Sequence, residues 1–400
     1  MKEQILQNFN SIIETPYVSV VFGGHRFGLK NTINPVTLTR DIDYITNLTI
    51  KKQASGQVNL YTLTLVYVIK PGDDPNKIDK ILGTDQTRKI IFSYGDLSQP
   101  SLTYKEEEAI ITNVKPSIDV VNAKIVYTIT ATSTVSLNYA IKRNYDSVVA
   151  QPSAQIFDLL YTDTSNGLLE LFPGMADRAS VEAKRLIART DKVVQIEAQQ
   201  NVSPLERLKA LVAQMQSSSN SFYGLVIHDY SDEIKTLNGQ WFEVIDSSLR
   251  PEKYSLDVDI GYPSNTKVFD FQVNNDTSFA LITKYSGNLE SSRIINVNDL
   301  GNFEFTRDPS FVVRNGQTNE VLKSWWKTMT SYPVSASLRI RGLIVPAVLA
   351  ETIRVNVIFF GRKYNYSGKY MVTGQTDVIS TSGYRTTLDL LRIEGDEEWQ

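Results

Sequence analysis

The chain contains no cysteine among its 400 residues. Disulfide bonds, thiolate metal sites and cysteine nucleophiles are therefore excluded. A chain with no thiols to oxidise fits assembly in a reducing compartment.

Histidine is almost as scarce, since only His25 and His228 are present. A Ser-His-Asp triad or a two-histidine metal site would have to use one or both of them. His25 lies in a glycine-rich turn, and His228 follows an apolar run. For each of them a surface or capping role is favoured over catalysis.

A basic excess is also missing, because 41 Lys and Arg face 44 Asp and Glu, giving a net charge of −3. The chain therefore has no electrostatic footprint for general nucleic-acid binding. No run approaches the roughly 18 apolar residues of a membrane span, and the acidic, amphipathic start "MKEQILQNFNSIIE" does not resemble a signal peptide. We expect no membrane insertion by this chain. We interpret the Asn-X-Ser/Thr sites at Asn47, Asn275 and Asn365 as chance.

Two carboxylate pairs are the remaining candidates for acid–base chemistry or metal binding. Asp41 and Asp43 stand two residues apart, as do Asp257 and Asp259. Residues at this spacing share one face of a strand, so either pair could act together. A solvated strand face explains both pairs equally well.

The sequence has no phosphate-binding loop, dinucleotide-binding glycine turn or nucleophile elbow. The adjacent Trp325 and Trp326 could stack on sugars or bases, but their helical spacing with apolar neighbours favours the core for at least one of them. We therefore expect no catalytic residues, no cofactor site and no metal site.

What the sequence does contain is β-strand patterning at both ends. The first 150 residues read mainly as strands, including Val58–Lys70, whose two apolar faces predict cover on both sides. A short helix ending at Gly83 and a hairpin over 107–134 follow. From residue 151 the period becomes helical, and Ser203, Pro204 and Glu206 form the start signal of the clearest helix.

Four more strands are predicted at the C-terminus, within residues 334–393, after a helix over Glu320–Pro333. Four strands would leave an open sheet, whereas barrels usually need more. We therefore predict that this unit borrows upstream strands, from Phe222–Ser248. The predicted division of the chain is 1–150, a first β-barrel; 151–221, helical or mixed; 222–250, strands joining the second barrel; 251–319, an inserted β-rich domain; and 320–400, the discontinuous second barrel with an acidic tail.

The two β regions also share a phrase. "VSVVFGGHRF" at Val18–Phe27 and "VNVIFFGRKY" at Val355–Tyr364 are identical at four of ten positions, and four further positions are close substitutions. Both read as a strand followed by a tight turn. This repetition predicts two copies of one β unit in a single chain.

The last 75 residues resemble the C-terminal module of phage baseplate hub proteins, the group that includes late-control D proteins and the N-terminal half of VgrG spikes. The matching phrases are the strand "YMVTGQTDVIS" and the run "SGYRTTLDL". Asp377 stands near the position where many relatives carry histidine. The residues that match the motif are Tyr370, Val372, Val378, Ser382, Gly383, Tyr384, Thr386, Thr387, Leu388 and Leu390.

This resemblance implies a mainly β fold with two tube-type antiparallel β-barrels and a mixed α/β middle region. It implies a structural, non-enzymatic homotrimer in which six barrels approximate the symmetry of the tail tube. Implied partners are the tail tube or distal tail protein, the central spike and the tape measure protein, with DNA passing through the lumen without specific binding. The implied location is the tail tip of the virion, after assembly in the host cytoplasm.

Three other functions are alternatives to a tail hub. A six-fold distal tail or tube-adaptor protein would contain one such barrel. A glycan-binding adhesin would show clustered exposed aromatic residues, and a cell-wall hydrolase would need an acid and nucleophile pair, of which His228 and Asp259 are the nearest candidates.

Overall fold

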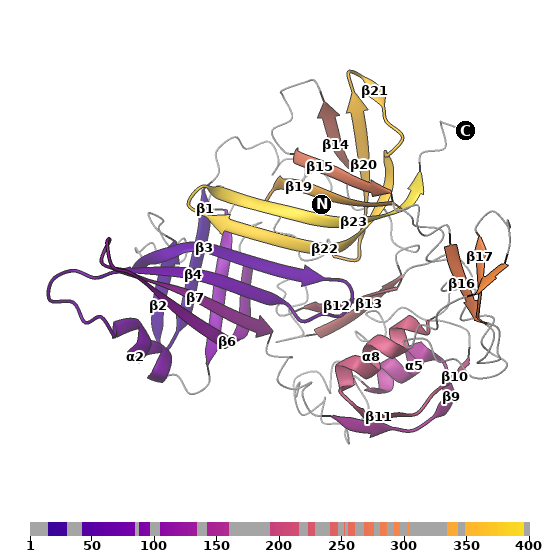
Figure 1. Ribbon diagram of the computed structural model, residues 1–400, viewed down its shortest axis with the longest axis horizontal. Helices are drawn as coiled ribbons and strands as arrows, with labels where there is room; N and C mark the ends of the chain where they lie inside the picture. Colours follow the sequence, from indigo (N-terminus) through magenta and orange to yellow (C-terminus); the bar gives the residue numbers. More distant parts are fainter. Residues whose placement is uncertain are drawn as a thin grey trace.

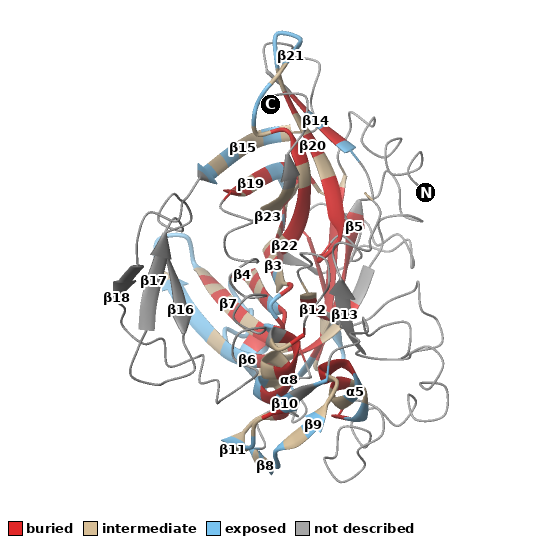
Figure 2. Ribbon diagram, turned by 90° about the vertical axis from the view of Figure 1, so that its right-hand side faces the viewer, coloured by how far each residue is buried: buried red, intermediate tan, exposed pale blue. Residues whose placement is uncertain are grey.

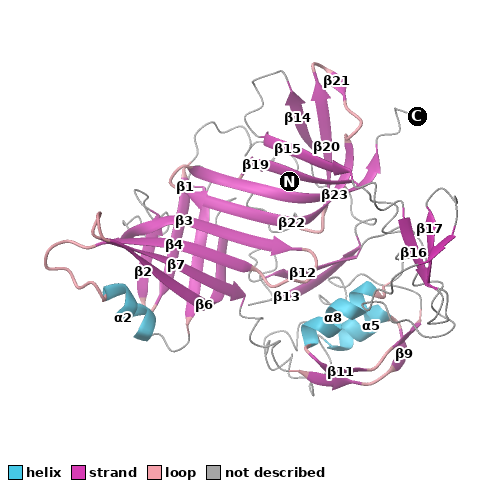
Figure 3. Ribbon diagram, viewed as in Figure 1, coloured by secondary structure: helices cyan, strands magenta, loops and turns pink. Residues whose placement is uncertain are grey.

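The computed structural model of the chain is built mostly of strands, with few helices (Figures 1 and 3). It describes residues 15–29, 42–84, 88–96, 105–133, 142–159, 193–215, 223–228, 241–246, 252, 255–260, 268–275, 281–285, 292–296, 302–304, 334–342 and 349–395. The mainly β fold predicted from the sequence is confirmed. None of the helices within these ranges is long and apolar enough to cross a membrane.

The first β unit is a closed barrel. Around the ring the order is β1, β2, β3, β4, β7, β6, β5 and back to β1, and only the β2–β3 pair is parallel. Closure gives each of these strands two neighbours in the ring, while β3 extends past its pairing with β2 and keeps an open edge from Asn47 to Gln53. Its strands are β1 (Pro16–Phe22), β2 (His25–Leu29), β3 (Ile42–Gln53), β4 (Leu60–Val68), β5 (Lys89–Asp96), β6 (Lys105–Asp119) and β7 (Lys124–Ser133).

The barrel interior follows from alternation along the strands. On β7 every second residue is buried, as predicted for the hairpin, and Figure 2 shows the alternating colours. On β4, Tyr61, Leu63 and the following odd-numbered positions face the core. The prediction that β4 is covered on both sides is wrong for the single chain, because its other face is the outer surface of the sheet, where Leu60 is 38% and Val68 is 51% exposed.

Helix α2 (Lys77–Thr84) lies against this barrel, and Ile78 and Ile81 join the barrel core. The predicted helix is therefore present. Gly83 lies inside its last turn, not beyond its end.

The described part of the middle region, 142–159 and 193–215, combines short strands with two helices, in line with the predicted mixed character. Helix α8 (Pro204–Ala213) begins with the predicted capping box, in which Ser203 and Glu206 each accept a hydrogen bond from the other's backbone N–H. The remaining elements are β8 (Arg143–Tyr145), β9 (Val148–Ala150), α5 (Pro152–Phe157), β10 (Val194–Ile196) and β11 (Gln199–Val202), with β8 paired to β11 and β9 to β10.

The second β unit is discontinuous in sequence. Its strand order is β14, β20, β22, β23, β19, β15, with the short β21 beside β20, and only the β14–β20 pair is parallel. In the described part of the chain, the outer strands β14 and β15 do not pair with each other. The strands are β14 (Ser255–Ile260), β15 (Val268–Asn275), β19 (Val334–Arg341), β20 (Thr352–Phe359), β21 (Arg362–Lys363), β22 (Gly368–Ser380) and β23 (Gly383–Gly395).

The upstream strands of this unit differ from the prediction. We expected them within 222–250, yet β12 (Tyr223–His228) and β13 (Trp241–Asp246) pair with each other. β12 also meets the end of β3, where Leu225 bridges Ser55 and exchanges backbone hydrogen bonds with Ala54 and Gly56, and its Val226 packs into the core of the second unit. The strands that pair with β20 and β19 are instead β14 and β15, from 255–275. A further small sheet contains β16 (Leu281–Tyr285), β17 (Ser292–Asn296) and β18 (Asn302–Glu304).

The repeated phrase forms the same structure twice. The first copy is the β1–β2 hairpin, closed by Phe22 opposite His25, and the second is the β20–β21 hairpin, closed by Phe359 opposite Arg362. Both two-residue turns have positive φ at both positions, 54° and 73° at Gly23 and Gly24, and 49° and 81° at Phe360 and Gly361. This is the turn geometry that the right-handed twist of a hairpin favours.

Candidate functional site

The two β units are joined along one strand pair. β3 of the first unit and β22 of the second are antiparallel neighbours from Asn47–Ser380 to Gln53–Gly374. The Ala54 N–H extends this seam by donating to the Thr373 carbonyl at 2.8 Å. As a result, β6, β7, β4, β3, β22, β23, β19 and β15 form one uninterrupted antiparallel sheet, which can be followed across Figure 1.

The outer surface of this joined sheet is rich in hydroxyl groups. Cross-strand partners share a face, and the registers place Thr130, Thr62 and Thr49 in one row across three strands. Most of these side chains are half-buried. The residues that define this hydroxyl-rich face are Thr49, Thr62, Thr64, Thr128, Thr130, Thr132, Ser335, Ser337, Thr376, Ser380 and Thr387.

Charges of both signs are interspersed with these hydroxyls. Lys51 and Asp389 are exposed, and Arg339 stands opposite Asp270 in the pairing of β19 with β15. The same registers place Lys115 and Arg385 on this face, so among these charged residues the cations outnumber the anions, although hydroxyl groups remain the most frequent polar groups.

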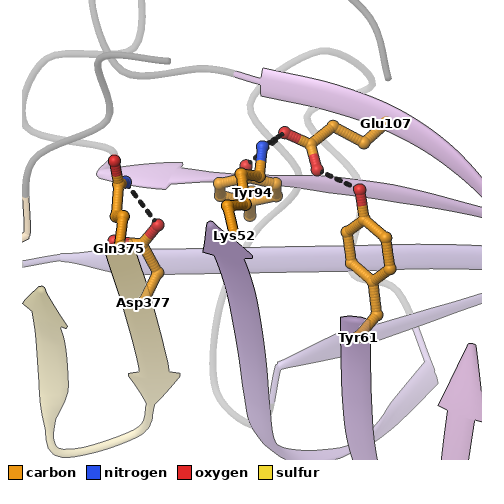
Figure 4. Close-up of polar contacts among 6 residues, drawn as sticks. All are labelled: Lys52, Tyr61, Tyr94, Glu107, Gln375 and Asp377. Carbon is orange, nitrogen blue, oxygen red and sulfur yellow. Dashed lines mark hydrogen bonds and ion pairs between the residues drawn. The ribbon is translucent and has the colours of Figure 1, made fainter. Parts of the chain in front are cut away.

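The opposite surface of the seam covers a buried polar cluster, which Figure 4 shows. Lys52 of β3 forms an ion pair with Glu107 of β6, whose side chain is 3% exposed. The Glu107 carboxylate also accepts hydrogen bonds from the Tyr61 and Tyr94 hydroxyls, at 2.6 and 2.7 Å. Each carboxylate oxygen thus has a donor, as a charge in a barrel interior requires.

A second carboxylate lies on the other side of the seam. Asp377 of β22 is 1% exposed and accepts hydrogen bonds from Thr386 Oγ1 at 2.5 Å and from Gln375 Nε2 at 2.7 Å. The Tyr384 hydroxyl faces the same carboxyl group without reaching it in a hydrogen bond of ordinary geometry. These three neighbours of Asp377 come from β22 and β23.

The two carboxylates have opposite pKa shifts. Burial raises the pKa of Asp377 from 3.8 to about 6, against the smaller lowering effects of its hydrogen bonds and of the nearby Lys52. Burial also opposes ionisation of Glu107, but the Lys52 charge and the donated hydrogen bonds bring the pKa of Glu107 below its usual value. Lys52 therefore mainly stabilises the Glu107 carboxylate.

The motif residues of the C-terminal run meet at this junction. Tyr384 is 2% exposed and, with Ile379, packs into the core of the first barrel although both residues belong to the second unit. Gly342 leaves the room for the Tyr384 ring, since a Cβ added there would lie 2.2 Å from a ring carbon. Leu388 and Leu390 face the separate core of the second unit.

The candidate residues from the sequence do not form a common site. His25 is exposed at the end of the first hairpin, and Asp257 is exposed and accepts a hydrogen bond from Asn356 Nδ2 at 2.8 Å. His228 lies on β12 and Asp259 on β14, but their side chains are outside the described residues. The same is true of the Asp43 side chain, while Asp41, Trp325 and Trp326 fall wholly outside, as does the helix expected at 320–333.

No group of three His, Asp or Glu side chains comes together as a metal site within the described ranges. Local sequence does not predict the Lys52–Glu107 pair, because its members are 55 positions apart. The one available signal was Asp377, the single carboxylate in β22. The junction therefore holds its own two halves together through buried ionic and hydrogen-bonded contacts.

Comparisons with known proteins place this fold. No family model matches the sequence, and no curated protein matches it. Among solved structures, the 43 kDa tail protein of prophage MuSo2 from Shewanella oneidensis matches with a TM-score of 0.54 and 12% identity, over 96% of this chain and 100% of that one. A tail protein from Neisseria meningitidis MC58 matches with a TM-score of 0.52 and 10% identity, over 94% and 97%.

A third structure, the Escherichia coli c3393 protein, described as a component of the type VI secretion system, matches with a TM-score of 0.48 and 9% identity, over 88% of this chain and 74% of that one. No conclusion below rests on this weaker likeness. The chain has the fold of the two tail proteins, and the resemblance seen in its C-terminal motif is confirmed at the level of fold.

Proposed function

We propose that this chain is a structural hub protein of a bacteriophage tail or a related injection machine, located at the tail tip where the tail tube meets the central spike. One observation carries the proposal: a single chain holds two β units joined edge to edge in one continuous sheet. The fold likeness to two tail proteins supports the same role.

Three copies of such a chain would supply six similar β units in a ring. A three-fold ring of this kind can face a six-fold tube on one side and a three-fold spike on the other, so duplication resolves the symmetry mismatch. The proposed partners are two further copies of this chain, the tail tube or distal tail protein, the central spike and the tape measure protein. Assembly would take place in the cytoplasm of the host bacterium, and the role is structural rather than enzymatic.

The hydroxyl-rich face is the proposed wall of the DNA channel. Affinity for the phosphate backbone comes mainly from fixed cations, and this face offers mostly neutral hydroxyl groups. DNA could then slide past without being held.

The symmetry of the purified protein tests the ring. We expect a mass three times the 45.1 kDa of one chain by light scattering, and six similar lobes with three-fold symmetry by particle averaging. The protein should be measured both alone and co-expressed with its tube and spike proteins. A six-fold ring, or a monomer under both conditions, would contradict the proposal.

Lysines on the channel wall test the second part. The triple variant Thr62→Lys, Thr128→Lys and Thr376→Lys adds three cations to the hydroxyl-rich face, which should slow genome delivery because each cation can bind a phosphate. The matched control is Val149→Lys, at a position on β9 that is 67% exposed. If the triple variant delivers the genome at the rate of the control, the hydroxyl-rich face does not line the DNA channel.

A further inference from the structure

The junction between the two β units contains an uneven set of buried charges. Lys52 is the cation of the cluster, while Glu107 and Asp377 are both carboxylates. Lys52 pairs directly with Glu107, whereas Asp377 accepts its hydrogen bonds from neutral groups, among them Thr386 and Gln375. With both acids ionised, the cluster holds one more negative than positive charge in a barrel interior.

Strands of both β units contribute side chains to this buried cluster. β3 supplies Lys52, β4 Tyr61, β5 Tyr94 and β6 Glu107, while the second unit supplies the remaining groups from β22 and β23. Those remaining groups are Gln375, Asp377, Tyr384 and Thr386.

We propose that Asp377 is a pH-dependent fastener between the two β units: its protonation tightens the β3–β22 seam, and its ionisation loosens that seam. The geometry supports this in two ways. Asp377 lies on the seam strand itself, opposite Ile50 of β3 and fully inside the junction. Ionisation of Asp377 would also place a second negative charge in a cluster whose one described cation, Lys52, is already paired with Glu107.

The sign of the effect follows from the pKa of each acid. The pKa of Asp377 is raised from 3.8 to about 6 by burial, so its contribution to stability is fully present below pH 4 and is lost as pH rises through 6. The pKa of Glu107 is lowered, so its contribution is lost only in more acidic solution, below its usual range near 4.5. The seam should therefore be tightest near pH 4, and a shift of about two pKa units allows up to ~100-fold weakening at neutral pH relative to that optimum.

Hydrogen exchange on the full-length protein tests the proposal. We compare the wild type with Asp377→Asn, which keeps the shape and removes the titration, and measure exchange of peptides from β3 and β22 at pH 5 and pH 7.5, corrected for the intrinsic rates. The wild type should lose about tenfold protection between these pH values, and Asp377→Asn should stay level. The matched control is Asp389→Asn, an exposed acid on the adjacent β23, which should behave as the wild type.

Equal protection of the wild-type seam at both pH values would overturn the proposal, as would an unaltered pH dependence in Asp377→Asn. A direct measurement remains decisive if that variant does not fold. Carboxyl carbon NMR of the wild type should show Asp377 titrating near pH 6, and a midpoint near 4 would also overturn the proposal.

Discussion

The first barrel and the second β unit use the same arrangement of strands in a different chain order. The spatial order in the first unit is β1, β2, β3, β4, β7, β6. The corresponding order in the second unit is β20, β22, β23, β19, β15, in which β20 pairs directly with β22. In the first unit β6 and β7 follow β4 along the chain, whereas β15 and β19 precede β20. The second unit is thus a circular permutation of the first over these strands.

The difference shows which features of the unit the fold depends on. Most strand neighbours and the two-residue hairpin turn recur, whereas the described strands of the second unit do not close into a ring. β5 closes the first barrel against β1 and β6, but β14 runs parallel to β20, and a groove of about 510 Å³ lies among β14, β15 and β20. Phe269 and Phe359 line that groove and are 43% and 38% exposed.

The largest expected effect concerns the ion pair under the seam. Lys52→Met leaves Glu107 buried without its cation, which should lower the free energy of unfolding by about 3–5 kcal/mol. The measurement is urea unfolding at pH 7. Lys51→Met is the matched control, since the adjacent Lys51 is exposed, and its change should stay within about 0.5 kcal/mol.

The double variant Lys52→Met with Glu107→Gln sharpens this test. Removing both charges should recover part of the loss, because the cost comes from the uncompensated carboxylate rather than from the missing contact. Equal stability of Lys52→Met and Lys51→Met would show that the pair does not hold the junction.

A medium effect is expected at the hairpin turns, because α2 packs against the first turn at Gly23 and no described residue packs against Gly361 in the second. A Cβ at Gly23 would lie 2.8 Å from the Ile81 carbonyl oxygen on α2, whereas Gly24 and its counterpart Gly361 have no atom within 4 Å. Gly23→Ala should cost about 2–3 kcal/mol, from both backbone strain and contact with the helix. Gly24→Ala and Gly361→Ala should each cost about 1 kcal/mol, from strain alone.

Thermal unfolding of the three variants measures this difference. Equal losses of stability in Gly23→Ala and Gly24→Ala would mean that α2 moves aside at no measurable cost. The contact of the first hairpin with α2 would then not affect stability.

The smallest effect concerns the residue that replaces glycine in the second hairpin. Phe360 has φ of 49° and is 72% exposed, at the position equivalent to Gly23. Asparagine tolerates this conformation better, so Phe360→Asn should stabilise the chain by about 0.5–1 kcal/mol. Phe359→Asn should instead destabilise it, because Phe359 packs edge to face with Tyr364 at 5.2 Å between ring centroids. Loss of stability in Phe360→Asn would indicate that the exposed ring contributes packing of its own.

Local patterns were enough to predict much of the fold. The capping box at Ser203 and Glu206, the alternation along β7 and the strands of the C-terminal unit all appear as expected. Each is a matter of residues close in sequence, where the period of 2 or 3.6 and the turn chemistry act directly. The repeated hairpin phrase belongs here too, since both copies form a two-residue turn with positive φ at both positions, although Phe360 replaces the first glycine.

The sequence by itself therefore determined the strands, the helices and the duplication of a hairpin. Only the tertiary structure decided which strands are neighbours: the β3–β22 seam, the choice of β14 and β15 over β12 and β13, and the meeting of Lys52 with Glu107. Strand edges all offer the same backbone donors and acceptors, so the local sequence does not specify a distant partner. Pairing is selected by how the whole set of apolar faces packs, and a buried charge finds its partner only once that packing is complete.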